Sequence, residues 1–152
     1  MAKTILITGA SSGLGAGMAR EFAAKGYNLA LCARRLERLE TLKQELQSQH
    51  SVQISIKVLD VTHYDDVFTV FKAFQQEFGT IDRIIVNAGV GDGRRIGKGN
   101  FEVNRATAET NFISALAQCE AAVEIFRAQN KGHLWVISSM SALRGLPKHL
   151  ST

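Results

Sequence analysis

The stretch TGASSGLG (Thr8–Gly15) stands between a short apolar run and a helical pattern. The run before it, KTILIT (Lys3–Thr8), is rich in β-branched residues and is typical of a buried parallel strand. The pattern after it (Gly13–Lys25) has helical spacing, and Gly26 supplies a cap. Glycines at such a junction let the backbone approach a pyrophosphate, and the helix N-terminus adds free amides with partial positive charge. The stretch therefore predicts a nucleotide-binding turn, with tight strand–helix packing alone as the alternative.

Strand and helix patterns alternate along the rest of the chain. Further strands are expected at Asn28–Ala33, Val52–Leu59, Ile81–Val86 and His133–Ile137. Helices are expected at Leu36–Gln49 and Asp65–Phe78, and a long helical segment, broken near Ala106, over Phe101–Gln129. This βαβαβαβαβ order predicts an α/β fold with a parallel sheet, right-handed crossovers and helices on both faces.

The composition is that of one soluble globular domain, residues 1–152, with 45% apolar and 21% charged residues. The formal net charge of +4 is consistent with an ordinary basic surface or with attraction of an anionic ligand. The basic residues are spread along the chain without interleaved aromatics, so we expect no nucleic-acid partner. No apolar run approaches the ~20 residues of a membrane helix, so we expect neither a membrane span nor a signal peptide.

Few residues outside the glycine-rich turn carry an obvious chemistry. Cys32 and Cys119 are far apart, which argues against a disulfide framework and fits a reducing, cytoplasmic location. The four histidines have no metal-ligand spacing, so no metal site is expected. The loop Gly89–Gly99 carries basic residues that could attract an anionic substrate or could simply be solvated.

The spacing of the glycines is Gly-x3-Gly-x-Gly. With Asn87-Ala88-Gly89 after the fourth expected strand, it resembles the short-chain dehydrogenase/reductase family, and the resemblance covers the whole chain. The other matches are Asp60 after the third strand, Asn111 in the long helical segment and Ser139 after the fifth strand. The resemblance implies a Rossmann-like, doubly wound parallel sheet of order 3-2-1-4-5, with the family's sixth and seventh strands absent. It also implies a homo-oligomer, a dimer or tetramer, for the full-length enzyme.

The end of the second expected strand bears on the choice of cofactor. A carboxylate there would hold the ribose 2′-hydroxyl and repel a phosphate. Ala33 occupies that place, and Arg34 and Arg35 follow it. Arginine grips phosphate with a charged, bidentate contact. The sequence therefore predicts NADP(H) rather than NAD(H), with Arg34 as the main 2′-phosphate ligand; alternatively, both arginines are solvated residues at a helix start.

The resemblance implies further cofactor contacts. Asp60 would accept a hydrogen bond from the adenine amino group, with Val61 beside the ring; a helix cap is the alternative role for Asp60. Asn87 and Gly89 would pass under the ribose. The full expected cofactor-binding set is Gly9, Ser11, Ser12, Gly13, Leu14, Gly15, Arg34, Arg35, Asp60, Val61, Asn87, Ala88 and Gly89.

The family's reaction is hydride transfer between nicotinamide and a carbonyl or alcohol. By resemblance, Ser139 would polarise the carbonyl, with its neighbour Ser138 the weaker candidate. Asn111 would hold a water in the proton relay. The family's tyrosine, which transfers the proton, follows the serine by about a dozen residues, and a lysine comes four residues after it.

No Tyr-x-x-x-Lys occurs in the sequence: neither Tyr27 nor Tyr64 is followed by a lysine at that spacing, and Lys148 does not match the lysine position. The tail Arg144–Pro147 resembles the family's run-up to the tyrosine. We therefore expect the N-terminal part of an enzyme of roughly 250 residues. We expect this part to be inactive alone, and marginally stable or self-associating because its fifth strand would be an apolar edge.

Two functions follow from these observations. The first is an NADP(H)-dependent carbonyl reductase or alcohol dehydrogenase, with this chain as its cofactor-binding part and a small carbonyl or alcohol as substrate. The alternative is a non-catalytic NADP(H)-binding module that acts as a redox sensor or as a partner subunit. Neither version identifies the substrate.

Overall fold

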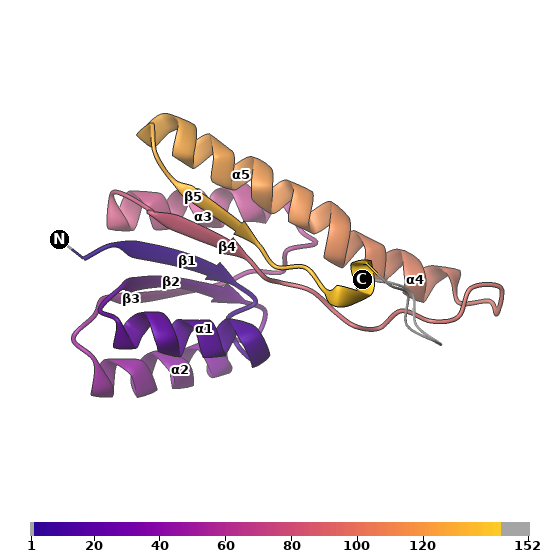
Figure 1. The fold of residues 1–152 in the computed structure, drawn as a ribbon, viewed down its shortest axis with the longest axis horizontal. Helices are drawn as coiled ribbons and strands as arrows, with labels where there is room; N and C mark the ends of the chain where they lie inside the picture. The colour runs from indigo at the N-terminus through magenta and orange to yellow at the C-terminus, as the bar shows by residue number, and fades with distance from the viewer. Residues whose placement is uncertain (1, 144–152) are drawn as a thin grey trace.

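One parallel sheet organises residues 2–143, the part of the chain that the computed structural model describes (Figure 1). Its strands are β1 (Thr4–Thr8), β2 (Asn28–Ala33), β3 (Ile54–Val58), β4 (Arg83–Val86) and β5 (His133–Val136). They lie in the order β3-β2-β1-β4-β5, and every neighbouring pair is parallel. The Rossmann-like α/β fold and the order 3-2-1-4-5 are therefore confirmed.

Helices cover both faces of the sheet. They are α1 (Gly13–Ala24), α2 (Leu36–Gln49), α3 (Tyr64–Phe78), α4 (Phe101–Ala108) and α5 (Ser114–Gln129), with a π-helical turn η1 (Glu109–Ile113) and a short 3₁₀ turn η2 (Met140–Ala142). Figure 1 shows α1 and α2 on one side of the sheet and α3 and α5 on the other. The crossovers from strand to helix to parallel strand place the helices in this way.

Successive residues of a strand pack alternately into two separate hydrophobic cores, one on each face of the sheet. Ile5 and Ile7 of β1 pack with α1 and α2, whereas Leu6 between them packs with α3 and α5. The α1 side is built from small residues, among them Ala19, so that helix lies close to the sheet. On the other side Phe71 of α3 is fully buried, and such burial contributes about 1.5–3 kcal/mol. The two cores fix the strand ends that carry the functional loops.

The long helical segment is continuous where a break near Ala106 was expected, so that expectation is wrong. Helix α4 runs through Ala106, and the backbone then widens into the π-helical turn Glu109–Ile113 before α5 begins. No proline or glycine occurs between Phe101 and Gln129, so nothing forces an interruption. Single π-helical turns often mark functional sites, and this one contains Asn111.

The outer strand β5 is less covered than the other four. Val136 is 52% exposed, whereas Val86 on β4 beside it is 2% exposed. Trp135 of β5 is only partly buried, against the α1 side. Helix α5 and η1 also present apolar side chains to solvent, with Phe112 70% exposed and Leu116 54% exposed.

Candidate cofactor-binding site

A cavity of about 550 Å³ opens at the carboxyl ends of the strands. It lies where the strand order reverses between β1 and β4, which is the usual ligand position in open α/β sheets. Its walls are the loops that follow β1, β2, β3 and β4, together with α4 and η1. Of the expected cofactor-binding residues, every one except Gly15 lines this cavity.

Two glycines of the turn after β1 have different local roles. A Cβ on Gly15 would lie 2.2 Å from the Gly9 carbonyl oxygen, so only glycine lets α1 start this close to β1. Gly13 has a φ of +53°, and a Cβ there would meet nothing within 4 Å. Gly15 therefore serves packing, while Gly13 faces the open cavity. The residues fit a bound pyrophosphate, because Gly13 leaves room for it directly at the N-terminus of α1.

Thr8 and Asn87 tie the ends of β1 and β4 together beneath the cavity. The buried Thr8 hydroxyl accepts hydrogen bonds from the amides of Asn87 (3.0 Å) and Ala88 (3.2 Å). The Asn87 side-chain amide donates in return to the carbonyls of Thr8 (3.2 Å) and Gly9 (3.3 Å). This network fixes the floor of the cavity. The sequence reasoning missed the role of Thr8, whose only signal was a polar residue ending an apolar strand.

Two arginines stand at the end of β2, beside the glycine-rich turn. Both are exposed and line the cavity. The Arg35 Nη2 donates to Ser12 Oγ at 3.2 Å and lies 3.4 Å from Ser11 Oγ. The expectation gave Arg34 the leading role, but it is Arg35 that contacts both turn serines. The positive charge of Arg34 acts on Asp60, which lines the same cavity.

Asp60 lies in the loop between β3 and α3 and forms a local turn there. Its Oδ1 accepts hydrogen bonds from the Thr62 hydroxyl (2.7 Å) and amide (3.0 Å). Partial burial works to raise the pKa of Asp60, but these hydrogen bonds and the charges of His63 and Arg34 prevail and lower it. Asp60 is therefore a carboxylate at neutral pH. It does not cap α3, because His63 is the N-cap residue and makes no side-chain cap bond.

The two expected catalytic residues do not line the cavity. The Asn111 side chain bonds the backbone of Val90 in both directions, with its Oδ1 accepting from the amide and its Nδ2 donating to the carbonyl, each at 2.7 Å. Exposed Ser139 shares a 2.8 Å hydrogen bond with the Ser141 hydroxyl and accepts one from the Ser141 amide at 3.2 Å. Both side chains are thus held by local partners. Lys148 and the tail 144–147 lie outside the described residues.

The cavity also contains residues that the sequence reasoning did not single out. These are Leu59, Thr62, Val90, Ala106, Glu109 and Thr110. Those on α4 and η1 reach the cavity only because the long helical segment passes over the end of β4, which no local pattern predicts. Residues 2–143 contain no cluster of side chains able to hold a metal ion. None of the helices in that range combines the length and hydrophobicity of a bilayer span.

Comparison of the sequence with known proteins gives a consistent result. The profile described as short chain dehydrogenase matches residues 3–151. An uncharacterized oxidoreductase of Mycobacterium tuberculosis (strain ATCC 25618 / H37Rv) is 52% identical over 144 residues, which are 94% of this chain and 57% of that protein. An NADP-dependent 3-hydroxy acid dehydrogenase of Schizosaccharomyces pombe is 35% identical over 141 residues, 91% of this chain and 54% of that protein. The chain thus spans little more than half the length of these relatives.

Two solved structures with the same arrangement contain a nicotinamide cofactor or a derivative of one. The alcohol dehydrogenase of the archaeon Thermococcus sibiricus, complexed with 5-hydroxy-NADP, has a TM-score of 0.91 at 31% identity and covers 98% of this chain and 63% of its own. An NAD+-bound xylitol dehydrogenase has a TM-score of 0.91 at 26% identity, with 97% and 56% covered. Both forms of the cofactor thus occur on this fold, so the fold alone does not select between them.

Proposed function

The chain belongs to the short-chain dehydrogenase family, and on that premise we propose that it is the cofactor-binding part of an NADP(H)-dependent carbonyl reductase or alcohol dehydrogenase. The family membership and the cofactor-bearing structural relatives support a nicotinamide cofactor in the cavity. The choice of NADP(H) and the reaction type go beyond these similarities. They rest on residues at the rim of the cavity.

One observation carries the preference for NADP(H): β2 ends without the carboxylate that would select NAD(H), and an oriented guanidinium group lies beside the glycine-rich turn. Ala33 ends β2 without a charge, and Arg35 follows with its Nη2 held against the hydroxyls of Ser11 and Ser12. A guanidinium and two hydroxyls together form a donor set suited to a phosphate. Because Arg35 is already positioned, less side-chain entropy is lost when it binds one.

The carboxylates that line the cavity do not oppose this assignment. Asp60 and Glu109 are the acidic residues in its wall. Asp60 is engaged by Thr62 and stands near the positive charge of Arg34. Glu109 lies 3.6 Å from the guanidinium of Arg105. Both negative charges are therefore partly compensated within the protein.

The nicotinamide ring, when bound, supplies or accepts the hydride. The chain's own residues orient the cofactor and the substrate. The start of α1, with the amides around Leu14, attracts the pyrophosphate, and the floor formed by Thr8 and Asn87 holds the ribose side of the cavity in place. We assign to Ser139 the role of donating a hydrogen bond to the substrate oxygen. Its present bond to Ser141 must then exchange for one to the substrate.

Binding measurements test the cofactor assignment. We expect NADPH to bind at least about tenfold more tightly than NADH, because a charge-assisted phosphate contact contributes about 1.5–3 kcal/mol. Arg35→Ser and Arg34→Ser should each reduce NADPH affinity while leaving NADH affinity within about twofold. The matched control is Arg38→Ser, which removes an exposed arginine from the first turn of α2. Titration calorimetry gives the constants for both cofactors, and tighter NADH binding would overturn the assignment.

The reductase assignment is tested on the natural protein and on variants of it. NADPH consumption should depend on an added aldehyde or ketone, and Ser139→Ala should lower kcat/KM by about a hundredfold. Ser138→Ala is the matched control, since it removes the neighbouring hydroxyl, and we expect an effect below about threefold. If NADPH binds but no carbonyl in a broad panel is reduced, the protein is a nucleotide-binding module without this chemistry.

A further inference from the structure

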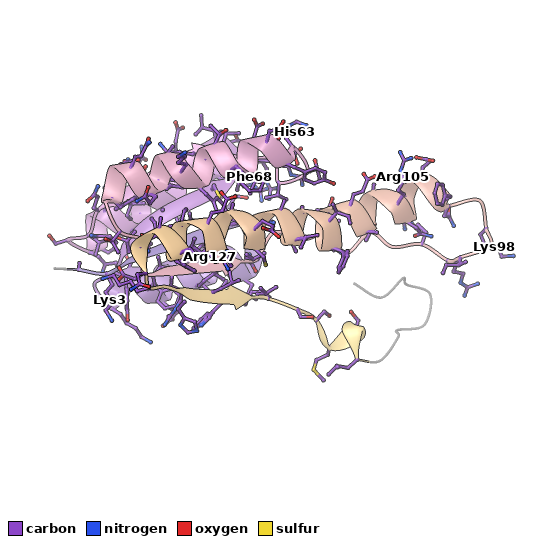
Figure 2. All side chains as sticks on the ribbon, turned by 90° about the horizontal axis from the view of Figure 1, so that it is seen from above. Lys3, His63, Phe68, Lys98, Arg105 and Arg127 are labelled. Carbon is purple, nitrogen blue, oxygen red and sulfur yellow. The ribbon has the colours of Figure 1, made fainter. Side chains whose placement is uncertain are left out.

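A second pocket lies at the amino-terminal ends of the strands, opposite the cofactor cavity at their carboxyl ends. It has a volume of about 260 Å³ and opens where β1, β4 and β5 begin. Figure 2 shows Lys3, which lines it, at the far end of the molecule from Lys98 in the loop after β4. The polar residues around it are Lys3, Tyr27, Asp82, Arg83, Lys131 and His133. None of the expected cofactor residues contributes to this pocket.

The pocket has an excess of positive charge. Lys3, Arg83 and Lys131 are cations, and none of them takes part in the ion pairs found among residues 2–143. The one carboxylate, Asp82, is bonded to the backbone, with its Oδ2 accepting from the Thr4 amide at 2.8 Å. Three cations around a small volume with one backbone-bonded carboxylate create a local potential that attracts an anion.

Arg83 is held in an orientation suited to binding. Its guanidinium lies 4.1 Å from the centre of the Trp135 ring, and its Nε lies 3.3 Å from His133 Nδ1. The Phe22 ring is 5.8 Å away. These contacts use the face and the Nε edge of the group. The Nη groups make no hydrogen bond or ion pair within residues 2–143, so the edge that grips phosphate bidentately is available.

The backbone beneath the pocket is rigid. The Asp82 amide donates to the Thr4 carbonyl at 2.9 Å, and the His133 amide donates to the Asp82 carbonyl at 3.1 Å. Arg83 and His133 are direct neighbours in the β4–β5 register. The beginnings of three strands are therefore fixed relative to one another, and the charged side chains project from a fixed frame.

We propose that this pocket is a second anion site, which binds the phosphate or diphosphate group of a small ligand. The volume is below the ~300–1,000 Å³ of sites that enclose a whole drug-sized molecule, so it fits a head group rather than a dinucleotide. Arg83 supplies the oriented bidentate contact. Lys3 and Lys131 add charge from the two sides of the opening.

Trp135 is the only tryptophan of the chain, so its indole N–H provides one NMR signal next to Arg83. The experiment is a titration of the protein with inorganic pyrophosphate at constant ionic strength, followed through this signal and by calorimetry. We expect a saturable shift. Arg83→Met should weaken binding about tenfold or more, because it removes a charge-assisted contact but keeps an aliphatic stem over the ring.

Matched variants distinguish binding in this pocket from binding in the cofactor cavity and from a general effect of surface charge. Lys72→Met removes an exposed charge from α3 and should leave binding unchanged. The double variant Arg34→Ser/Arg35→Ser should also leave the Trp135 shift unchanged, since it alters only the cofactor cavity. Lys131→Met, at an exposed position, should weaken binding a few-fold and tests the site independently of any folding defect in Arg83→Met.

Three results would overturn the proposal. The first is the absence of a saturable shift up to about 10 mM pyrophosphate, well above the range of a useful site. The second is an equal response to sodium chloride of matched ionic strength, which would show screening only. The third is binding that disappears in the Arg34→Ser/Arg35→Ser variant but persists in Arg83→Met and Lys131→Met, because the anion would then occupy the cofactor cavity alone.

Discussion

The turn after β1 differs from the two segments that carry the expected catalytic residues, η1 and the residues after β5, in what holds it in place. In the turn, the conformation follows from the backbone: Gly13 has a φ of +53°, and Gly15 allows α1 to approach the Gly9 carbonyl. Asn111 and Ser139, by contrast, are held by side-chain hydrogen bonds to Val90 and Ser141. A binding surface set by backbone geometry is formed before any ligand arrives. Side-chain contacts of the second kind can exchange when one binds.

The largest expected effect comes from breaking the backbone-determined region. Gly15→Ala would place a Cβ 2.2 Å from the Gly9 carbonyl oxygen and 2.8 Å from Asn87 Nδ2. Because the nearest contact is backbone, either α1 or the turn must shift. We expect a loss of about 3 kcal/mol in the free energy of unfolding and of cofactor affinity with it. Urea denaturation followed by circular dichroism measures the first.

Gly17 provides the matched control in the same helix. A Cβ at Gly17 would meet nothing within 4 Å, and alanine favours the helix interior over glycine. Gly17→Ala should therefore raise the free energy of unfolding by about 0.8 kcal/mol. The two substitutions should thus change the free energy of unfolding in opposite directions, which separates the effect of close packing at Gly15 from that of helix propensity at Gly17. Equal effects of the two substitutions would mean that the contact at Gly15 does not limit the fold.

A smaller effect is expected at the floor of the cavity. Thr8→Val keeps the shape of a fully buried side chain but leaves the amides of Asn87 and Ala88 without their acceptor. We expect a destabilisation of about 2 kcal/mol and weaker cofactor binding. Thr8→Ser keeps the hydroxyl and loses only a methyl group, at a cost of about 0.8 kcal/mol. A larger loss in Thr8→Ser than in Thr8→Val would refute the role of the hydroxyl.

Most of the fold could be predicted from the sequence because it follows from local patterns, and the resemblance to a known family supplied most of the residues expected in the cavity. The apolar runs and helical spacing predict the strands and helices within a few residues of their observed bounds, as Asn28–Ala33 and Leu36–Gln49 illustrate. Parallel strands necessarily bring their carboxyl ends to one edge, so the residues after β1, β2, β3 and β4 meet there. The predicted residues line the cavity for that reason.

The remainder depends on contacts between distant segments, which no local pattern contains. Nothing near Thr8 indicates that its hydroxyl bonds to amides 79 and 80 residues further along. Where a break was expected near Ala106, the helix instead continues into a π-helical turn around Asn111. No proline or glycine causes this turn, so the local sequence does not signal it. Which of Arg34 and Arg35 reaches the serines depends on side-chain direction at the start of α2, and sequence order alone does not specify that.

Asn111 is expected to contribute a smaller, local effect. Asn111→Ala removes both hydrogen bonds to Val90, so hydrogen exchange at the Val90 amide should accelerate about fivefold. The control is Asn104→Ala, because Asn104 Oδ1 accepts in the same way from the Arg94 amide at 2.7 Å in the same loop. Each substitution should accelerate exchange at its own amide only. Acceleration throughout the loop in both variants would indicate that the loop opens as one unit.

The smallest expected effect is the contribution of Asp60 to stability at acid pH. Partial burial opposes the charged form, but the hydrogen bonds from Thr62 and the charges of His63 and Arg34 hold the pKa of Asp60 below its ordinary value of 3.8. The unfolded chain therefore binds the proton more readily than the folded one. The resulting stabilisation is fully present above about pH 3.8 and is lost as the pH falls through the lower, folded-state value.

Asp60→Asn should accordingly flatten the dependence of the free energy of unfolding on pH below about 4, where the wild-type carboxylate takes up its proton on unfolding. The asparagine oxygen can still accept from Thr62, so the turn is kept and only the charge is removed. Thr62→Val, which removes the hydroxyl that donates to Asp60 at 2.7 Å, should flatten the same dependence in part. Urea midpoints between about pH 6 and pH 3 provide the measurement. If the free energy of unfolding depended on pH in the same way in the wild type and in Asp60→Asn, the local turn would not favour the carboxylate. Asp60 would then bind its proton equally well in the folded and the unfolded chain.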